Sequence, residues 1–193
     1  NLYYKIETIR QLFAGMATSK LIILEGISGT GKTSLAYALG KFFSFDSAII
    51  PVQPSWKDRT ELLGYYNEFT KKFNETEFLK AVYAVSYSDT INIIVLDEMN
   101  LARVEYYFAE FLSIMEMPDP SEWKIDLVPV SEPLDPKNLI NGKLFIKKKG
   151  LMSFSFYSLE RNATTGSLCA ALWDGTSPES TLNVIDIPII NTA

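Results

Sequence analysis

The segment from Gly26 to Thr33 constrains the fold of this chain more than any other part of the sequence. Its letters, GISGTGKT, fit the pattern G-x-x-x-x-G-K-[ST] of a phosphate-binding loop, or P-loop. The apolar run 21–24 before it is typical of a buried strand, and residues 34–39 after it are typical of a helix. Strand, glycine-rich loop and helix form the context that this pattern requires. We therefore expect a nucleotide-binding α/β fold.

Each kind of residue in the loop has a chemical task. Glycines let the backbone curl so that N–H groups point at phosphate oxygens, and the following helix adds the positive end of its dipole. Lys32 would place its charge on the β- and γ-phosphates, and the Thr33 hydroxyl can ligate Mg²⁺. The alternative is a glycine-rich turn without a ligand. The expected nucleotide-binding residues are Gly26, Ser28, Gly29, Thr30, Gly31, Lys32, Thr33 and Ser34.

Composition narrows the classes of function. A chain of 193 residues, of which 47% are hydrophobic and 21% charged, can form one α/β domain with a sizeable core. The absence of histidine excludes Ser-His-Asp and Cys-His catalysis and His-based metal sites in this chain. A single cysteine, Cys169, excludes an intrachain disulfide, so a cytoplasmic location is the expectation.

Charge and hydropathy also bear on partners. The net charge of −5 does not favour direct binding of DNA or RNA by this surface. No apolar run is long enough to span a membrane, and no signal peptide precedes the first expected strand, so we expect no membrane association.

Hydrophobic periodicity up to residue 116 predicts strands that alternate with helices. Such alternation implies right-handed βαβ units and a parallel sheet, whose ligands bind at the carboxyl ends of the strands. The expected helices are 3–14, 32–43, 73–86 and 101–115, the expected strands are 20–25, 48–52 and 91–96, and residues 53–58 are an expected loop.

The pattern changes after residue 116. Residues 123–127 alternate apolar and polar, which predicts a half-exposed strand. The pair Asn141-Gly142 lies between the apolar runs 139–140 and 144–146, which is typical of a hairpin with a type I′ turn. We therefore expect a C-terminal part rich in β-hairpins.

A second acidic motif completes the expected site. The apolar run 93–96 ends in Asp97 and Glu98, 65 positions after Lys32 (97 − 32 = 65). Asp97 would hold Mg²⁺ through water or the Thr33 hydroxyl, and Glu98 would orient and polarise the attacking water. Two adjacent acids favour hydrolysis over transfer to a small acceptor. The alternative is that these acids only cap the next helix.

Three ordered segments, 26–33, 52–67 and 96–103, together resemble the McrB-type AAA+ NTPases, which are motor subunits of modification-dependent restriction systems and their relatives. The resemblance covers roughly residues 20–146. It implies a P-loop NTPase of the AAA+ type, with a parallel sheet flanked by helices. It also implies Mg²⁺-dependent hydrolysis of ATP or GTP between the subunits of a hexameric ring in the full-length protein. A nuclease subunit would be a partner, and DNA would be reached through other domains.

The family pattern assigns roles to matching residues only. Lys32, Glu98 and Arg103 are the expected catalytic residues, and Thr33 and Asp97 are the expected metal ligands. Arg103 lies with Asn100 within one turn of the site and could reach a γ-phosphate or a neighbouring subunit. A surface ion pair with Glu105 or Glu110 is the favoured interpretation of Arg103.

The segment from Trp56 to Asn67 has no task in nucleotide chemistry. Two interpretations stay open for Trp56 and for Leu62, Gly64 and Tyr66: hydrophobic packing of a long connection, or a pore or partner surface.

The resemblance ends after Ile146. We divide the chain into an incomplete AAA+ core, 1–146, and a divergent β-rich extension or tail, 147–193, either part of the same domain or disordered. A polar sensor residue is expected either at the end of 187–193, where Asn191 lies, or near 154–157, which has no suitable asparagine. No helical lid is visible, and the lysine run 147–149 suggests the hypothesis of a frame-disturbed tail.

Two other functions remain as alternatives. If the lid and the arginine finger are absent, the chain would be a non-hydrolysing module in which nucleotide only organises oligomers. A small-molecule kinase shares the P-loop, but the paired acids and the segment 56–67 argue against it. Because no helical lid is visible, we expect the isolated chain to bind nucleotide weakly and, if it is an NTPase, to hydrolyse it poorly.

Overall fold

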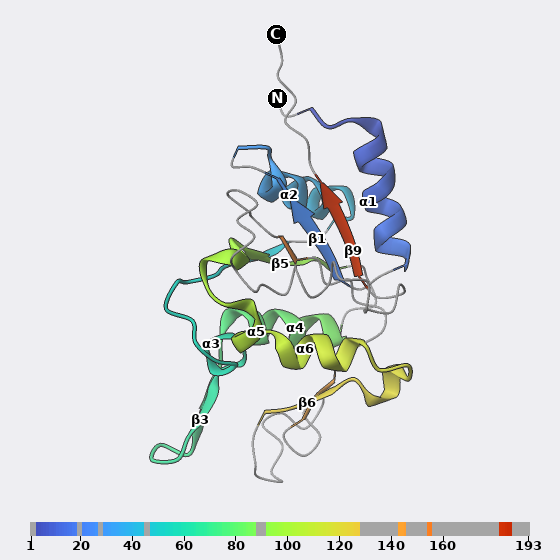
Figure 1. The fold of residues 1–193 in the computed structure, drawn as a ribbon. Helices are drawn as coiled ribbons and strands as arrows, with labels where there is room; N and C mark the ends of the chain where they lie inside the picture. The colour runs from blue at the N-terminus through green and yellow to red at the C-terminus, as the bar shows by residue number, and fades with distance from the viewer. Residues whose placement is uncertain are drawn as a thin grey trace.

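The structure, a computed structural model, describes residues 3–18, 21–26, 29–44, 47–87, 92–127, 143–145, 154–155 and 182–186. Figure 1 shows these elements as layers: helices α1 and α2 lie on one side of the central strands, and helices α3 to α6 lie on the other.

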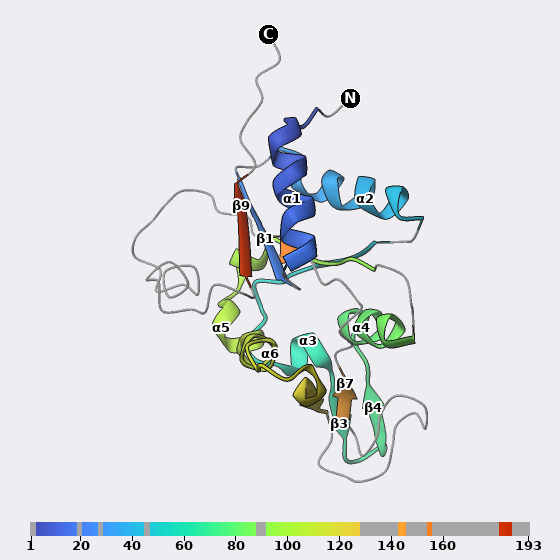
Figure 2. The same cartoon turned by 90° about the vertical axis from the view of Figure 1, so that its right-hand side faces the viewer.

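Parallel strands form the centre of the fold. Strand β1 (Leu21–Glu25) pairs in parallel with β8 (Phe154–Ser155) on one side and with β9 (Leu182–Asp186) on the other. Strand β2 (Ala48–Pro51) pairs in parallel with β5 (Ile94–Asp97), and β5 also lies beside β8. Strands β8, β1 and β9 form one parallel sheet, β2 and β5 form a second parallel pair, and β5 contacts β8, so the predicted parallel arrangement of strands is confirmed. Figure 2 shows β1 beside β9.

Both faces of this sheet are buried. Successive side chains of a strand point to opposite faces. On β1, Leu21 and Ile23 belong to one buried cluster, whereas Ile22 and Leu24 belong to a second cluster on the other face. The run 93–96 divides in the same way, since Ile94 and Leu96 face the first cluster and Ile93 and Val95 face the second. Double-sided burial explains why these segments are uninterrupted apolar runs.

Two helices cover the second cluster. They are α1 (Ile6–Thr18) and α2 (Lys32–Phe42), and they contribute the buried Leu12, Leu35 and Leu39. The predicted helix 32–43 agrees with α2 to within one residue. The predicted helix 3–14 exists, but it begins later, at Ile6, and ends later, at Thr18.

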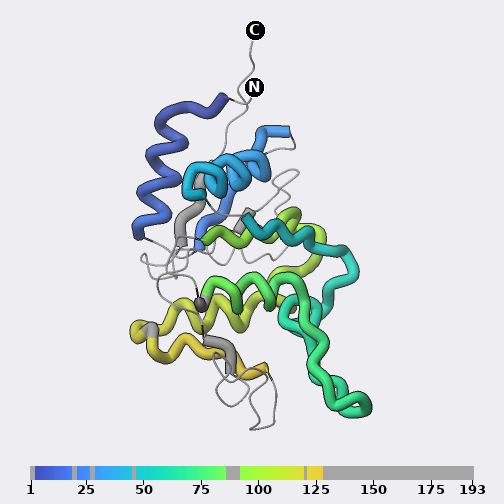
Figure 3. Tube along the Cα trace, turned by 180° about the vertical axis from the view of Figure 1, so that it is seen from behind, coloured from blue at the N-terminus to red at the C-terminus, as the bar shows by residue number. Residues whose placement is uncertain are grey.

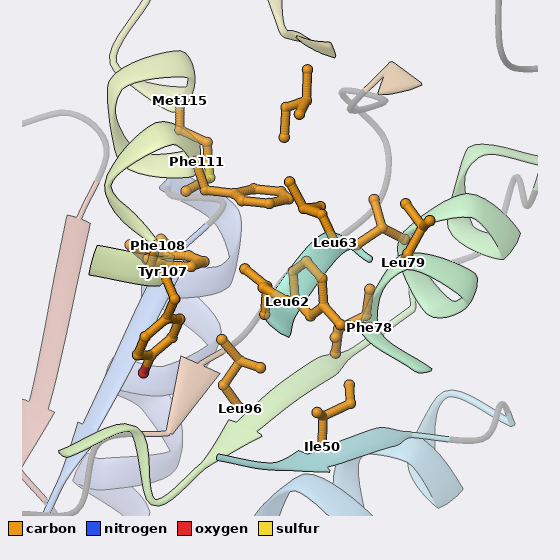
Figure 4. Close-up of a cluster of buried hydrophobic side chains, with 14 of the residues drawn as sticks. Ile50, Leu62, Leu63, Phe78, Leu79, Leu96, Tyr107, Phe108, Phe111 and Met115 are labelled. Carbon is orange, nitrogen blue, oxygen red and sulfur yellow. The ribbon is translucent and has the colours of Figure 1, made fainter. Parts of the chain in front are cut away.

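Among the described residues, the other face is covered by four helices, three of which contribute aromatic residues to the first cluster (Figure 4). These are α3 (Thr60–Leu63), α4 (Glu77–Tyr87), α5 (Val104–Tyr107) and α6 (Ala109–Met115). Phe111 stacks on Phe108 with ring centroids 5.5 Å apart and meets Phe78 edge to face at 5.2 Å. Each of these buried rings stabilises the fold by roughly 1.5–3 kcal/mol relative to an exposed one.

The prediction of one continuous helix over 101–115 is wrong. A 3₁₀ turn, η1 (Met99–Leu101), comes first, and Ala102 (φ −124°, ψ 164°) and Arg103 (φ −73°, ψ 104°) are extended before α5 begins. The Tyr107 hydroxyl donates a hydrogen bond of 3.0 Å to the Met99 carbonyl oxygen. This side-chain hydrogen bond joins η1 to α5, whereas a continuous helix would have joined them by backbone hydrogen bonds.

The predicted helix 73–86 is also partly wrong, because a hairpin occupies its first residues. Strands β3 (Tyr65–Asn67) and β4 (Lys72–Asn74) pair antiparallel, and α4 begins only at Glu77. The Thr76 hydroxyl accepts a hydrogen bond of 3.1 Å from the Leu79 N–H, which fixes this later helix start. Figures 1 and 3 show the hairpin extending away from the body of the molecule.

The half-exposed strand over 123–127 is confirmed. Ile125 in β6 (Lys124–Asp126) is buried between exposed neighbours, and Trp123 and Leu127 are buried on either side. A short 3₁₀ turn, η2 (Pro120–Glu122), precedes it. Strand β7 (Lys143–Phe145) pairs antiparallel with β6. The expected turn at Asn141-Gly142 and the run 139–140 lie outside the described residues.

Two described stretches of the C-terminal extension, β8 and β9, pair with β1. The division at residue 146 and the hypothesis of a frame-disturbed tail stay predictions. In the part of the chain that the structure describes, no helix follows β6, and no helix is both long and apolar enough to cross a membrane.

Gly64 provides a test of the hairpin geometry. It has φ 83°, and a Cβ atom there would overlap the Asn74 carbonyl oxygen, whereas a Cβ atom at Gly29 (φ 81°) would meet nothing within 4 Å. We expect Gly64→Ala to lower the free energy of unfolding by more than about 2 kcal/mol, and the control Gly29→Ala to lower it by about 1 kcal/mol from backbone strain alone. Denaturant unfolding without nucleotide measures both, and equal losses would contradict the clash.

Candidate nucleotide-binding site

The P-loop lies where β1 ends and α2 begins. Gly29 (φ 81°) and Gly31 (φ 89°) adopt backbone conformations that side chains disfavour, and Gly31 is the N-cap of α2. Gly26 and Thr30 are half-buried in this turn, and Ser34 is exposed in the first turn of α2. Ile27 and Ser28 lie outside the described residues, so the role expected of Ser28 stays a prediction.

Lys32 is the buried cation of the site. Only 6% of its surface is exposed, which is rare for a lysine without polar partners. Its Nζ donates a hydrogen bond of 2.8 Å to the Gly26 carbonyl oxygen and lies 3.4 Å from the Thr30 hydroxyl. Burial lowers the pKa of the Lys32 ammonium, while Glu98 and Asp97 oppose that shift. The lysine is thus held inside the loop, close to both acids.

The structure brings together the two residues expected to ligate a metal. The Thr33 hydroxyl lies 3.2 Å from each carboxylate oxygen of Asp97, although the two residues are 64 positions apart. A hydroxyl and a carboxylate are oxygen donors of the kind that Mg²⁺ prefers. Within the described ranges, no group of three or more His, Cys, Asp or Glu side chains could hold a metal. An ion between Thr33 and Asp97 would therefore complete its shell with water or phosphate oxygens.

Glu98 occupies a strained position at the end of β5. Its backbone is left-handed (φ 58°, ψ 42°), which is uncommon for a residue with a side chain. Burial, and then the neighbouring Asp97, raise the pKa of the Glu98 carboxyl, and Lys32 opposes this shift. Its side chain makes no capping hydrogen bond to η1, so the helix-cap interpretation is wrong for Glu98.

Arg103 has a different partner from the one expected. Its Nη1 donates a hydrogen bond of 3.0 Å to the Tyr106 hydroxyl, and the guanidinium lies 5.6 Å from the centre of the same ring. Glu110 pairs instead with Arg59, at 2.6 Å, and the described part of the chain holds no ion pair between Arg103 and Glu105. The favoured ion-pair interpretation is therefore wrong. Arg103 is exposed, and its catalytic role stays a prediction.

The segment 56–67 serves mainly for packing. Trp56 meets Tyr107 edge to face with ring centroids 5.2 Å apart, and Leu62 is fully buried. Beyond Gly64 the character changes, because Phe69, at the tip of the hairpin, is 100% exposed. The interpretation of the segment 56–67 as a pore or partner surface stays a prediction. Phe69 was missed in the sequence analysis. Asn67 was an available signal, because asparagine favours turns. Its side chain accepts hydrogen bonds from the N–H groups of Phe69 and Thr70.

One expected sensor placement falls on a central strand. Strand β8 (Phe154–Ser155) pairs with β1 and contacts β5. Residues 156–157, like the alternative segment 187–193 with Asn191, lie outside the described residues. Asn100, the other polar residue near the acids, is exposed.

Comparison with solved structures shows a known architecture. A candidate ATPase from Cytophaga hutchinsonii matches with a TM-score of 0.54 and 18% identity, over 96% of this chain and 47% of that protein. NtrX from Brucella abortus gives a TM-score of 0.49 and 14% identity, over 95% of this chain and 36% of that one. No family model and no curated protein matches the sequence.

The first of these likenesses shows the fold. This chain spans about half the length of the Cytophaga hutchinsonii protein, so the likeness covers one part of that molecule. Together with the loop geometry, it shows that the chain has an α/β P-loop fold shared with that candidate ATPase.

The raised pKa of Glu98 predicts how stability depends on pH. Folding disfavours the charged carboxylate, so the stability that Glu98 contributes is fully present below its unfolded pKa of about 4.3 and is lost as pH rises through the folded pKa. Glu98→Gln should therefore unfold at higher denaturant concentration than wild type at pH 7.5, and this gain should vanish near pH 4.

The matched control for this measurement is Glu116→Gln, which removes the same charge from an exposed position at the end of α6. A gain in Glu98→Gln that is equal at both pH values would contradict the assignment, because an uncharged effect of the substitution would then explain it.

Proposed function

We propose that this chain is an NTPase domain of the AAA+ type. It binds a nucleoside triphosphate with Mg²⁺ and hydrolyses the phosphoanhydride bond to the γ-phosphate. The observation that carries the proposal is the contact between Thr33 and both oxygens of Asp97, beside the buried Lys32. A glycine-rich turn without a ligand would gain nothing from burying a lysine next to two acids, since burial of charge is costly.

Each residue has one task in this proposal. Lys32 binds the phosphate oxygens, and Thr33 and Asp97 would hold Mg²⁺, which supplies positive charge to the phosphates when it is bound. Glu98 orients the water and accepts its proton. A carboxylate with a raised pKa is a better proton acceptor than an ordinary one, because general-base strength follows pKa.

The main test separates binding from turnover. Lys32→Ala should weaken binding of Mg-ATP and Mg-GTP by at least about a hundredfold, because it removes charge-assisted hydrogen bonds to phosphate. Lys41→Ala, at an exposed position in the same helix, is the control and should bind like wild type. Titration calorimetry measures the affinities, and undiminished binding by Lys32→Ala would refute the proposal.

The same preparation distinguishes hydrolysis from mere binding. Glu98→Gln should bind nucleotide but release phosphate at least about a hundredfold more slowly than wild type. If wild type binds nucleotide but releases no phosphate, the chain is a non-hydrolysing assembly module. Phosphate release without any added acceptor would argue against a kinase.

The finer assignment rests on the resemblance of three sequence motifs to McrB-type motors. The resemblance supports a homo-oligomeric ring, a hexamer, in the full-length protein, with a nuclease subunit as partner and DNA bound through other domains. The single cysteine, Cys169, supports a cytoplasmic location. The exposed Phe69 at the hairpin tip and the exposed Arg103 are two described surface features that such an assembly could use.

Arg103 gives the test of assembly-dependent catalysis. If it completes the site of a neighbouring subunit, Arg103→Ala should leave nucleotide affinity within about twofold and lower turnover at least about tenfold. Arg10→Ala, an exposed arginine in α1, is the control. Turnover and light scattering are measured together over a range of protein concentrations. Full activity of Arg103→Ala would contradict a catalytic role for Arg103, whose only described contact would then be the one with Tyr106.

A further inference from the structure

The segment before α1 contacts the P-loop directly. The Tyr4 hydroxyl donates a hydrogen bond of 2.7 Å to the carbonyl oxygen of Gly31, which lies 27 positions later in the chain. The Tyr4 ring is half-buried and packs against the cluster that contains Leu35 and Leu39 of α2. The hydroxyl is thus held at the loop by both its ring and its hydrogen bond.

We infer that Tyr4 is a positioning residue for phosphate binding, which orients the peptide between Gly31 and Lys32 through its hydroxyl. The inference rests on the proposed nucleotide binding and adds to it a residue from outside the sequence motifs.

The two polar groups of a trans peptide point in opposite directions. The Gly31 carbonyl and the Lys32 N–H belong to the same peptide unit. The carbonyl points along α2, since it also accepts a hydrogen bond of 2.8 Å from the Leu35 N–H. The Lys32 N–H therefore points the other way, toward the N-terminal end of α2, where a helix binds phosphate.

This peptide needs an external support because of where it lies. Gly31 is left-handed (φ 89°, ψ 17°), and a glycine has a wide choice of backbone conformations. A rotation of the peptide would swing the Lys32 N–H away from a bound phosphate. A second donor on the Gly31 carbonyl opposes that rotation, and it also polarises the N–H of the same peptide, because hydrogen bonds in a chain strengthen one another.

The Tyr4 hydroxyl is suited to act as a permanent donor. Burial raises the pKa of the phenol above its ordinary value, so the group stays protonated at physiological pH. Its neighbour Tyr3 is 71% exposed and makes no hydrogen bond to the described residues of the loop, so the two adjacent tyrosines differ in burial and in this contact. Tyr3 is therefore a matched control.

The experiment compares Tyr4→Phe, which keeps the ring and removes only the hydroxyl, with Tyr3→Phe. Dissociation constants are measured for Mg-ATP and for inorganic Mg-tripolyphosphate, and thermal unfolding is followed without ligand. We expect Tyr4→Phe to weaken binding of both ligands by the same factor, roughly three- to tenfold, which is the value of one neutral hydrogen bond. Tyr3→Phe should bind both as wild type does.

A purely structural role would give a different result. If Tyr4→Phe lowers the unfolding temperature but leaves both dissociation constants unchanged, the hydroxyl only stabilises the fold and the inference is overturned. If ATP binding weakens but tripolyphosphate binding does not, Tyr4 acts on the nucleoside and the inference is again overturned. A Tyr4→Phe protein that does not fold would likewise overturn it.

The proposed function is judged separately in the same series. Loss of tripolyphosphate binding in Lys32→Ala supports phosphate binding by the loop, whatever Tyr4→Phe does. If Lys32→Ala binds normally, the proposed function fails. If Lys32→Ala loses binding and Tyr4→Phe does not, only the inference about Tyr4 fails.

Discussion

Burial of β1 and β5 on both faces is the constraint on which the rest of the structure depends. Alternate side chains of these strands enter two separate clusters, one under α1 and α2 and one under α4 to α6. Strand β8 pairs in parallel with β1 and contacts β5, so the two strands that carry the site lie close together. The P-loop follows β1. Asp97 is the last residue of β5, and Glu98 comes next. The packing of these strands therefore brings the Thr33 hydroxyl within 3.2 Å of Asp97.

The candidate site is held at some expense of stability. It contains a buried lysine with a lowered pKa, a glutamate with a raised pKa and a glutamate backbone in the left-handed region. Each of these opposes folding, and none is needed to complete the core. Proteins commonly accept such local conflicts at functional sites and compensate for them elsewhere. Here the compensation is the double-sided burial of the two strands that carry the site, and the hydrogen bonds of Lys32 and Thr33.

Segments outside the sheet have two kinds of relation to the site. The stretch before α1 joins it through the bond between Tyr4 and Gly31, and Trp56 packs on Tyr107, which in turn bonds to the turn after the acids. The β3–β4 hairpin instead leaves the body of the molecule and exposes Phe69. The connection between β2 and β5 thus has two parts. Trp56 supports the site through Tyr107, whereas the β3–β4 hairpin exposes Phe69 to solvent.

The sequence by itself determined the P-loop, the strands β1, β2 and β5 and the proximity of Thr33 and Asp97, because these follow from local apolar runs and from the rule that parallel strands end at one edge. It did not determine the parallel pairing of β8 and β9 with β1. It also indicated which residues of 101–115 are buried, since helical spacing reports a buried face. Only the tertiary structure decided the break at Ala102 and Arg103, the later start of α4 and the bond between Arg103 and Tyr106. It alone also revealed the contact between Tyr4 and Gly31. These features depend on contacts between residues far apart in the chain or on single backbone angles, and periodicity carries no information about either.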